Sequence, residues 1–160
     1  MATKRTTRRK RAPAKKSPAR KPRAPAGATR RQPESLRLRG VFPGVTVRDL
    51  QRSIRWYRDV LGFTEGQKWE ANGQVMGIEM VAGTMRFYLN QDDFTKGRDR
   101  ALGAGVRLWS RTAQDIDMIA TRVKARGGTL LQEVQNVGWG PRGFAIDDPD
   151  GYHLTIFQEP

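Results

Sequence analysis

Apolar and polar residues alternate at the C-terminal end of the chain, and this alternation predicts two strands, over residues 143–147 and 152–158. The residues between them, Asp148-Pro149-Asp150-Gly151, have a turn composition: proline suits the second position because its φ is fixed, and glycine accepts a positive φ. In the second strand, His153 and Thr155 fall on the face opposite Leu154. The chain is therefore expected to end in a β-hairpin with two chemically different faces.

A strand–helix–strand–strand–strand pattern occurs twice. Apolar residues at helical spacing follow an aspartate suited to an N-cap in residues 49–61 and again in residues 115–126, and the two aspartates are 66 positions apart. Glycine follows both predicted helices, at Gly62 and at Gly127-Gly128. Strand-like runs complete both copies: residues 41–47, 63–70, 74–81 and 84–90 in the first, and 105–111, 129–134, 143–147 and 152–158 in the second.

This repeat predicts an α+β fold of two βαβββ modules over residues 36–160, with residues 91–103 as a polar connector. A unit of this kind cannot close its own sheet. We therefore expect the two modules to pair into one curved mixed sheet with both helices outside. The concave face of such a sheet is the expected position of a ligand pocket.

The N-terminal segment has a different composition. Residues 1–33 contain 13 of the 30 Lys and Arg residues and none of the 16 Asp and Glu residues, so residues 34–160 have a net charge of only +1. Five prolines and the lack of large apolar side chains after Met1 predict that residues 1–35 are a disordered basic tail. Mobile cations bind phosphates through counterion release, so residues 1–33 predict weak, sequence-independent nucleic-acid binding; a solubilising tail is the alternative. The basic residues proposed for this contact are Lys4, Arg5, Arg8, Arg9, Lys10, Arg11, Lys15, Lys16, Arg20, Lys21 and Arg23.

The sequence contains no cysteine, and no apolar run approaches the roughly 20 residues that a membrane-spanning helix needs. The first feature excludes disulfide and thiolate chemistry. Together they predict a cytoplasmic protein that has no membrane partner.

Several motifs occur in a fixed order along the globular part. They are Val47-Arg48-Asp49-Leu50, Trp56-Tyr57, Leu61-Gly62-Phe63, Lys124-Ala125-Arg126-Gly127-Gly128, Trp139-Gly140-Pro141-Arg142 and Asp148-Pro149-Asp150-Gly151-Tyr152. In this order and at this spacing they resemble the vicinal oxygen chelate superfamily, which includes glyoxalase I, bleomycin-resistance proteins, fosfomycin-resistance enzymes and extradiol dioxygenases. The likeness covers residues 38–158 and implies the paired βαβββ modules that the internal repeat also predicts.

Metal enzymes of this superfamily hold a divalent ion with His, Glu or Gln side chains on four strands. The resemblance carries these positions over to Phe42, to Arg86 or Tyr88, to Leu108 or Trp109, and to Thr155. None of these side chains has a carboxylate or an imidazole, so no combination of them would bind a divalent ion well. We therefore expect a protein of this fold that has no metal and no other cofactor.

Three residues outside these positions are also candidates for ligand contacts. His153 is the only histidine and shares a strand face with Thr155. Trp139 and Arg142 lie on a Gly-rich loop, where a ring and a planar cation suit an anionic or aromatic ligand, with loop packing as the alternative. The predicted ligand-binding residues are Phe42, Arg86, Tyr88, Leu108, Trp109, Trp139, Arg142, His153 and Thr155.

These features favour a small-molecule-binding protein of the glyoxalase/bleomycin-resistance type, which we expect to be a homodimer. Two alternatives stay open. One is a lyase or dioxygenase-type enzyme with displaced metal ligands, for which Glu79 and His153 are candidates. The other is a nucleic-acid-associated protein whose domain dimerises while its tail binds DNA. The sequence does not identify the ligand.

Overall fold

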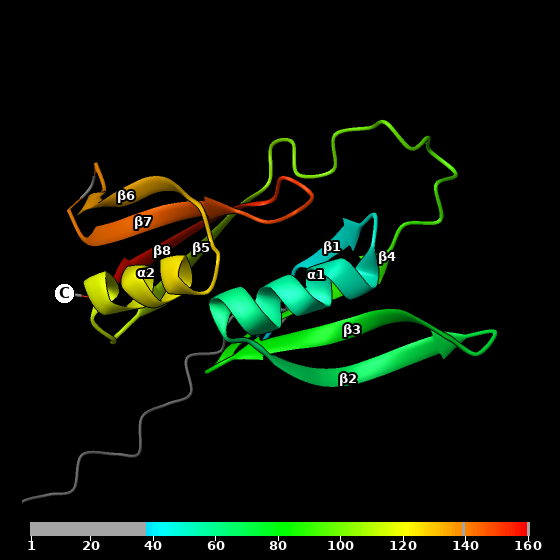
Figure 1. Cartoon of the computed structure of the whole chain (residues 1–160). Helices are drawn as coiled ribbons and strands as arrows, with labels where there is room; N and C mark the ends of the chain where they lie inside the picture. Colours follow the sequence, from blue (N-terminus) through cyan, green and yellow to red (C-terminus); the bar gives the residue numbers. More distant parts are fainter. Residues whose placement is uncertain (1–37, 139, 160) are drawn as a thin grey trace, which may run out of the picture. The chain divides into compact units, whose positions relative to one another are not determined.

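Two βαβββ modules make up the structure, a computed structural model that describes residues 38–138 and 140–159 (Figure 1). The tail predicted over residues 1–35 lies outside the described residues, so its disorder stays a prediction. Residues Arg39–Pro160 form one compact unit. Within the described part of the chain, no helix has the length and apolar character needed to cross a membrane.

The elements follow the order predicted from the sequence. The first module contains β1 (Gly44–Val47), α1 (Leu50–Trp56), the π-helical turn η1 (Tyr57–Leu61), β2 (Thr64–Ala71), β3 (Gln74–Ala82) and β4 (Met85–Gln91). The second contains β5 (Arg107–Thr112), α2 (Ile116–Ala125), β6 (Leu130–Asn136), β7 (Arg142–Asp147) and β8 (His153–Gln158). The α+β class and the two modules are confirmed.

The strands form two four-stranded sheets instead of the single mixed sheet that we expected. Sheet A has the order β1-β4-β3-β2, and sheet B has the order β5-β8-β7-β6. Each sheet contains one parallel pair, β1 with β4 and β5 with β8. The edge strands β1 and β5 do not pair with each other. A cleft is lined by β5 and by Val41 to Pro43, the residues that lead into β1.

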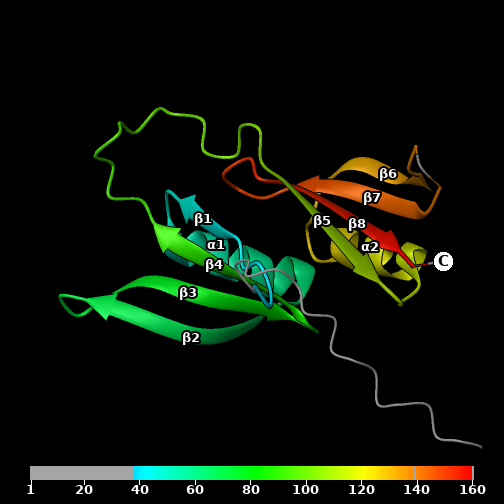
Figure 2. The ribbon, with the colours of Figure 1, turned by 180° about the vertical axis from the view of Figure 1, so that it is seen from behind.

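Each sheet has an inner face, which a helix covers, and an outer face without a helix. Both helices lie in front of their sheets in Figure 1, and Figure 2 shows the outer faces from behind. In sheet A, Val47, Ile78 and Phe87 of the inner face are fully buried together with residues of α1. In sheet B, Ile146 and Leu154 are buried in the same way with residues of α2. The two inner faces belong to one continuous hydrophobic core.

Local sequence signals explain where the helices begin. Asp49 Oδ1 accepts a hydrogen bond from the backbone N–H of Arg52 at 2.9 Å, and Asp115 Oδ1 accepts one from that of Met118 at 3.0 Å. Both predicted N-caps are thus confirmed. The first helix was expected to be α-helical to residue 61, but its last five residues form a π-helical turn, in which Tyr57 and Val60 are both buried.

The turn between β7 and β8 also joins the two modules. Asp148 Oδ1 accepts the N–H groups of Asp150 and Tyr152, both at 2.9 Å, and its Oδ2 accepts the hydroxyl of Tyr57 at 3.1 Å. Asp150 forms an ion pair with Arg48 at 2.8 Å. The turn predicted here is confirmed, and Gly151 has the expected positive φ of 86°. Its two buried carboxylates additionally hold the second module against η1 and against Arg48, which follows β1.

The connector before β5 packs against this turn at a glycine. A Cβ atom at Gly103 would meet the backbone carbonyl of Gly151, which cannot move without disturbing the turn. We expect Gly103→Ala to lower the free energy of unfolding by about 2 kcal/mol, the usual cost of overpacking. Chemical denaturation of the full chain measures this change.

Gly138→Ala is the matched control. A Cβ atom at Gly138 would meet no described heavy atom within 4 Å, apart from its chain neighbours. The unfolded chain loses freedom when glycine becomes alanine, so the control should be neutral or slightly more stable. Equal effects of the two substitutions would contradict the close approach of the connector to the turn.

Candidate functional site

Three aromatic residues gather on the outer face of sheet A. Tyr88 of β4 lies between Trp69 of β2, with ring centroids 5.5 Å apart, and Phe42, at 6.4 Å. Trp69 is paired with Gly77 of β3, and its ring lies so close to this glycine that a Cβ atom there would overlap it. Glycine in β3 thus lets the indole lie against the sheet. The result is an aromatic surface with Phe42 53% exposed at its rim.

An ion pair lies beside these rings. Arg86 Nη1 is 3.0 Å from Glu79 Oε1, and the Glu79 side chain is only 12% exposed. Tyr88 is paired with Glu79 in the sheet, so the acid, the base and the aromatic rings share one face. This face offers stacking surface, a hydrogen-bond acceptor and a cation within a few strand positions.

The outer face of sheet B combines one large aromatic residue with polar side chains. Trp109 of β5 is paired with Thr155 of β8, and both lie on this face, the indole 53% exposed and the threonine buried. His153 lies on the same face, and its Nδ1 is 2.8 Å from Asp147 Oδ1. The predicted grouping of His153 with Thr155 agrees with this register. The histidine, however, already has a carboxylate partner.

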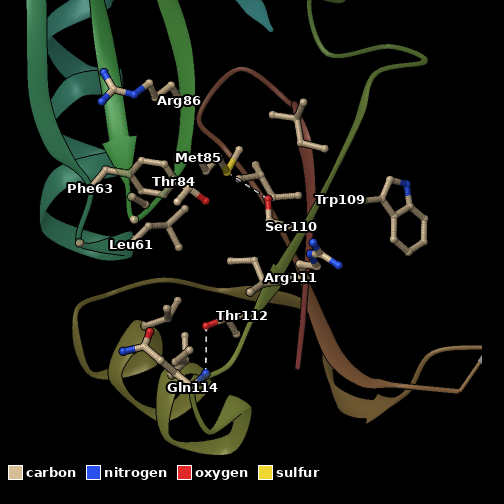
Figure 3. A pocket seen from close by; sticks show the side chains of 18 of the residues that line it. Leu61, Phe63, Thr84, Met85, Arg86, Trp109, Ser110, Arg111, Thr112 and Gln114 are labelled. Atoms are coloured by element: carbon tan, nitrogen blue, oxygen red, sulfur yellow. Dashed lines mark hydrogen bonds between the residues drawn. The ribbon is translucent and has the colours of Figure 1, made fainter. Parts of the chain in front are cut away.

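A cleft of about 1080 Å³ lies between the two modules (Figure 3). Strand β5 lines it on one side; on the other are the β3–β4 turn, η1 and the residues leading into β1. In Figure 3, Ser110 projects toward Met85, with its hydroxyl 3.2 Å from the sulfur, whereas Trp109 lies on the other side of β5. The cleft therefore reaches from the outer face to the inner side of β5.

The predicted ligand-binding residues occupy different places around this region. Phe42, Arg86, Leu108 and Trp109 all line the cleft, although Leu108 belongs to the buried inner face. Tyr88, His153 and Thr155 lie on the outer faces of their sheets. Arg142 begins β7 and forms an ion pair with Asp117 at 2.8 Å, and Trp139 lies outside the described residues.

The positions expected to hold a metal do not fit a divalent ion. Phe42 and Leu108 have no donor atom, and the guanidinium group of Arg86 is protonated at neutral pH. The phenol of Tyr88, the indole of Trp109 and the hydroxyl of Thr155 are poor metal ligands. Within the described part of the chain, no three His, Cys, Asp or Glu side chains come together as a metal site would require. Glu79 and His153, the proposed substitutes, lie on different sheets; Glu79 pairs with Arg86, and His153 Nδ1 lies 2.8 Å from Asp147 Oδ1.

Sequence reasoning missed Trp69. Its strand, β2, is largely exposed and lacks a clear alternation of apolar and polar residues, so the side-chain direction could not be read from it. The usable signal was the isolated Gly77 within a strand-like run, which often marks the close approach of another group. That Trp69 lies opposite Gly77 could be recognised only from the register between β2 and β3.

Residues 41–156 match the model of the Glyoxalase/Bleomycin resistance protein/Dioxygenase superfamily. No curated protein matches the chain.

Solved structures share the fold. TioX from Micromonospora sp. ML1 has a TM-score of 0.61 and 19% identity, over 76% of this chain and 100% of TioX. A protein of unknown function from Agrobacterium tumefaciens has a TM-score of 0.59 and 25% identity, over 79% of this chain and 98% of that one. A superfamily member from Sphaerobacter thermophilus has a TM-score of 0.58 and 22% identity, over 75% of this chain and 98% of that one. With the family model covering most of its length, the chain belongs to the glyoxalase/bleomycin resistance protein/dioxygenase superfamily.

Proposed function

We propose that this protein binds a small organic molecule without the help of a metal ion. The observation that carries the proposal is the set of side chains at the superfamily's metal positions, where Phe42, Tyr88 and Trp109 supply aromatic surface instead of metal ligands. Aromatic rings with a few polar groups beside a cleft are typical of sites for organic ligands. Trp69, Arg86 and Glu79 add stacking area and polar anchors on the same face.

Metal analysis of the purified full chain tests this proposal. After dialysis we expect far less than one equivalent of nickel, zinc, iron or manganese, because the donors present are poor ligands. Divalent ions should also leave the melting temperature unchanged. An ion that binds a real site stabilises the fold by about 4 kcal/mol at 1,000 times its Kd, so such a site would be seen easily.

One retained equivalent of metal would instead favour a lyase or dioxygenase-type enzyme with a displaced site. The variants Glu79→Gln and His153→Gln would then show whether these residues are ligands. As a control, Glu133→Gln removes an exposed carboxylate of β6 that pairs with Lys124 and is not one of the proposed ligands. Loss of the metal in the first two variants but not in the third would replace the metal-free proposal.

We also infer that the protein forms a homodimer. Val41, Phe42 and Trp109 are 81%, 53% and 53% exposed, respectively, and all three line the cleft. Large apolar side chains that gather at a surface commonly mark an interface or a ligand site.

Nucleic-acid binding through the basic tail is a second candidate function. It is favoured by the charge distribution, with 13 basic and no acidic residues in residues 1–33. The two functions would reside in different parts of the chain, so one does not exclude the other.

A further inference from the structure

The cleft between the modules has a charge that differs sharply from that of the domain. Its lining includes five arginines and no aspartate or glutamate. Residues 34–160 as a whole contain 17 basic and 16 acidic residues, so the lining does not simply reflect the composition. The arginines are Arg86, Arg107, Arg111, Arg122 and Arg126.

Three of these arginines form no ion pair with a described residue, although the charge of Arg126 acts on Asp59 and helps to lower the pKa of that carboxyl group. Arg86 pairs with Glu79 and Arg111 with Glu159, but Arg107, Arg122 and Arg126 form no ion pair with any described residue. Arg122 and Arg126 are four positions apart on α2 and at its C-terminal cap, so their charges lie on one face of the helix and repel each other. The lining therefore carries positive charge that Glu79, Glu159 and Asp59 offset only in part.

The remaining lining is mainly apolar. Leu61, Phe63, Met85, Leu108 and Ile119 contribute side chains from η1, the residue before β2, β4, β5 and α2. The volume of about 1080 Å³ suits a molecule of drug-like size. An occupant that matches this lining has an apolar body and at least one negative group, because an anion forms charge-assisted hydrogen bonds with the exposed guanidinium groups and an uncharged molecule does not.

We propose that the cleft binds an apolar organic anion, such as an aromatic or aliphatic carboxylate, sulfonate or phosphate ester. This inference rests on the proposed small-molecule-binding function and specifies that the ligand is negatively charged. Guanidinium groups suit such anions because their planar N–H donors can bind two oxygens at once. The exposed heads of Arg122 and Arg126 would meet the anionic group at the cleft mouth while the apolar body lies against Leu61 and Ile119.

Two matched fluorescent probes test the proposal on the full chain. 8-Anilinonaphthalene-1-sulfonate is an apolar anion, and N-phenyl-1-naphthylamine has the same ring skeleton without the sulfonate. We expect the sulfonate to bind at least tenfold more tightly than the neutral probe. The double variant Arg122→Gln/Arg126→Gln should weaken sulfonate binding at least tenfold and leave binding of the neutral probe unchanged.

Arg52→Gln is the control, because it removes one exposed cation near the start of α1 that does not line the cleft and leaves the basic tail intact. It should change neither affinity by more than about twofold, since distant surface charges are screened. Arg107→Gln provides an independent variant on β5 should the α2 variant fold poorly, and it should also weaken sulfonate binding.

Each other outcome overturns the proposal in a distinguishable way. Equal affinity for both probes, or equal loss in the control variant, would show that the cleft does not select anions, while small-molecule binding would stand. Failure of both probes to bind would contradict the proposed function as well. A change of molar mass by light scattering in the α2 variant, with sulfonate affinity unaltered, would show that the arginines hold a second copy of the chain.

Discussion

Asp148→Ala should lower the free energy of unfolding by about 3 to 5 kcal/mol, since removal of this side chain leaves several buried donors without an acceptor. The carboxylate accepts the N–H groups of Asp150 and Tyr152 and the hydroxyl of Tyr57, and the residue is only 5% exposed. The loss is a large fraction of the stability of a typical domain. Thermal and urea denaturation of the full chain measure it.

Asp147→Ala is the matched control on the neighbouring residue. Asp147 pairs with His153, but its side chain is 44% exposed, so its removal should change stability by less than about 0.5 kcal/mol. Tyr57→Phe should fall between the two, because it removes one donor and leaves Asp148 its two backbone partners. If Asp147→Ala destabilised the protein as strongly as Asp148→Ala, the special role of the buried turn would be disproved.

The pH dependence of Asp148→Asn gives a second measure of the same site. Burial raises the pKa of Asp148, because the carboxylate loses solvation that its hydrogen bonds only partly replace. A raised folded-state pKa contributes stability that is present below the ordinary value of 3.8 and is lost as pH rises through the folded-state pKa. The stability of the wild type relative to Asp148→Asn should therefore fall as pH rises above about 4. A constant difference would contradict the burial of the ionised group.

The parts of the fold that depend on local sequence could be predicted. The aspartate caps, the glycine helix ends and the final turn are set by residues within a few positions of each other, and the structure has them where the sequence indicates. The division into two sheets depends instead on whether β1 and β5 meet. No local pattern encodes that contact, and the sequence did not predict the cleft that β5 lines together with Val41 to Pro43.

The candidate site, too, could be predicted only where it depends on residues close together in the sequence. Alternation along β8 correctly placed His153 and Thr155 on one face. The choice between Leu108 and Trp109 stayed open until the pairing of β5 with β8 placed only Trp109 opposite Thr155. The cluster of arginines could not be predicted, because its members come from β4, β5 and the end of α2 and meet only in the folded chain.

Replacing the charge of the tail should reduce nucleic-acid affinity by a factor of about 100 or more at low salt, because the tail supplies nearly all of the excess positive charge. Residues 1–33 carry 13 basic and no acidic residues, whereas residues 34–160 have a net charge of +1. In this variant of the full chain, glutamine replaces each lysine and arginine proposed for the contact, from Lys4 to Arg23. The other residues of the tail are kept. Binding to duplexes of unrelated sequence is measured by fluorescence anisotropy.

Salt dependence distinguishes phosphate contacts from other modes of binding. Each neutralised phosphate contributes close to 0.9 to the slope of log affinity against log salt, so about six contacts would lower the affinity by about 10³-fold between 50 and 200 mM salt. Unrelated duplexes should bind equally, since mobile Lys and Arg side chains reach phosphates without reading base edges. The control is Arg122→Gln/Arg126→Gln, which removes two cations of the folded domain and should lower the affinity of the intact chain by much less than the tail variant does. Affinity that survives the glutamine replacements, or that does not respond to salt, would assign any nucleic-acid binding to the domain and remove the tail from the proposal.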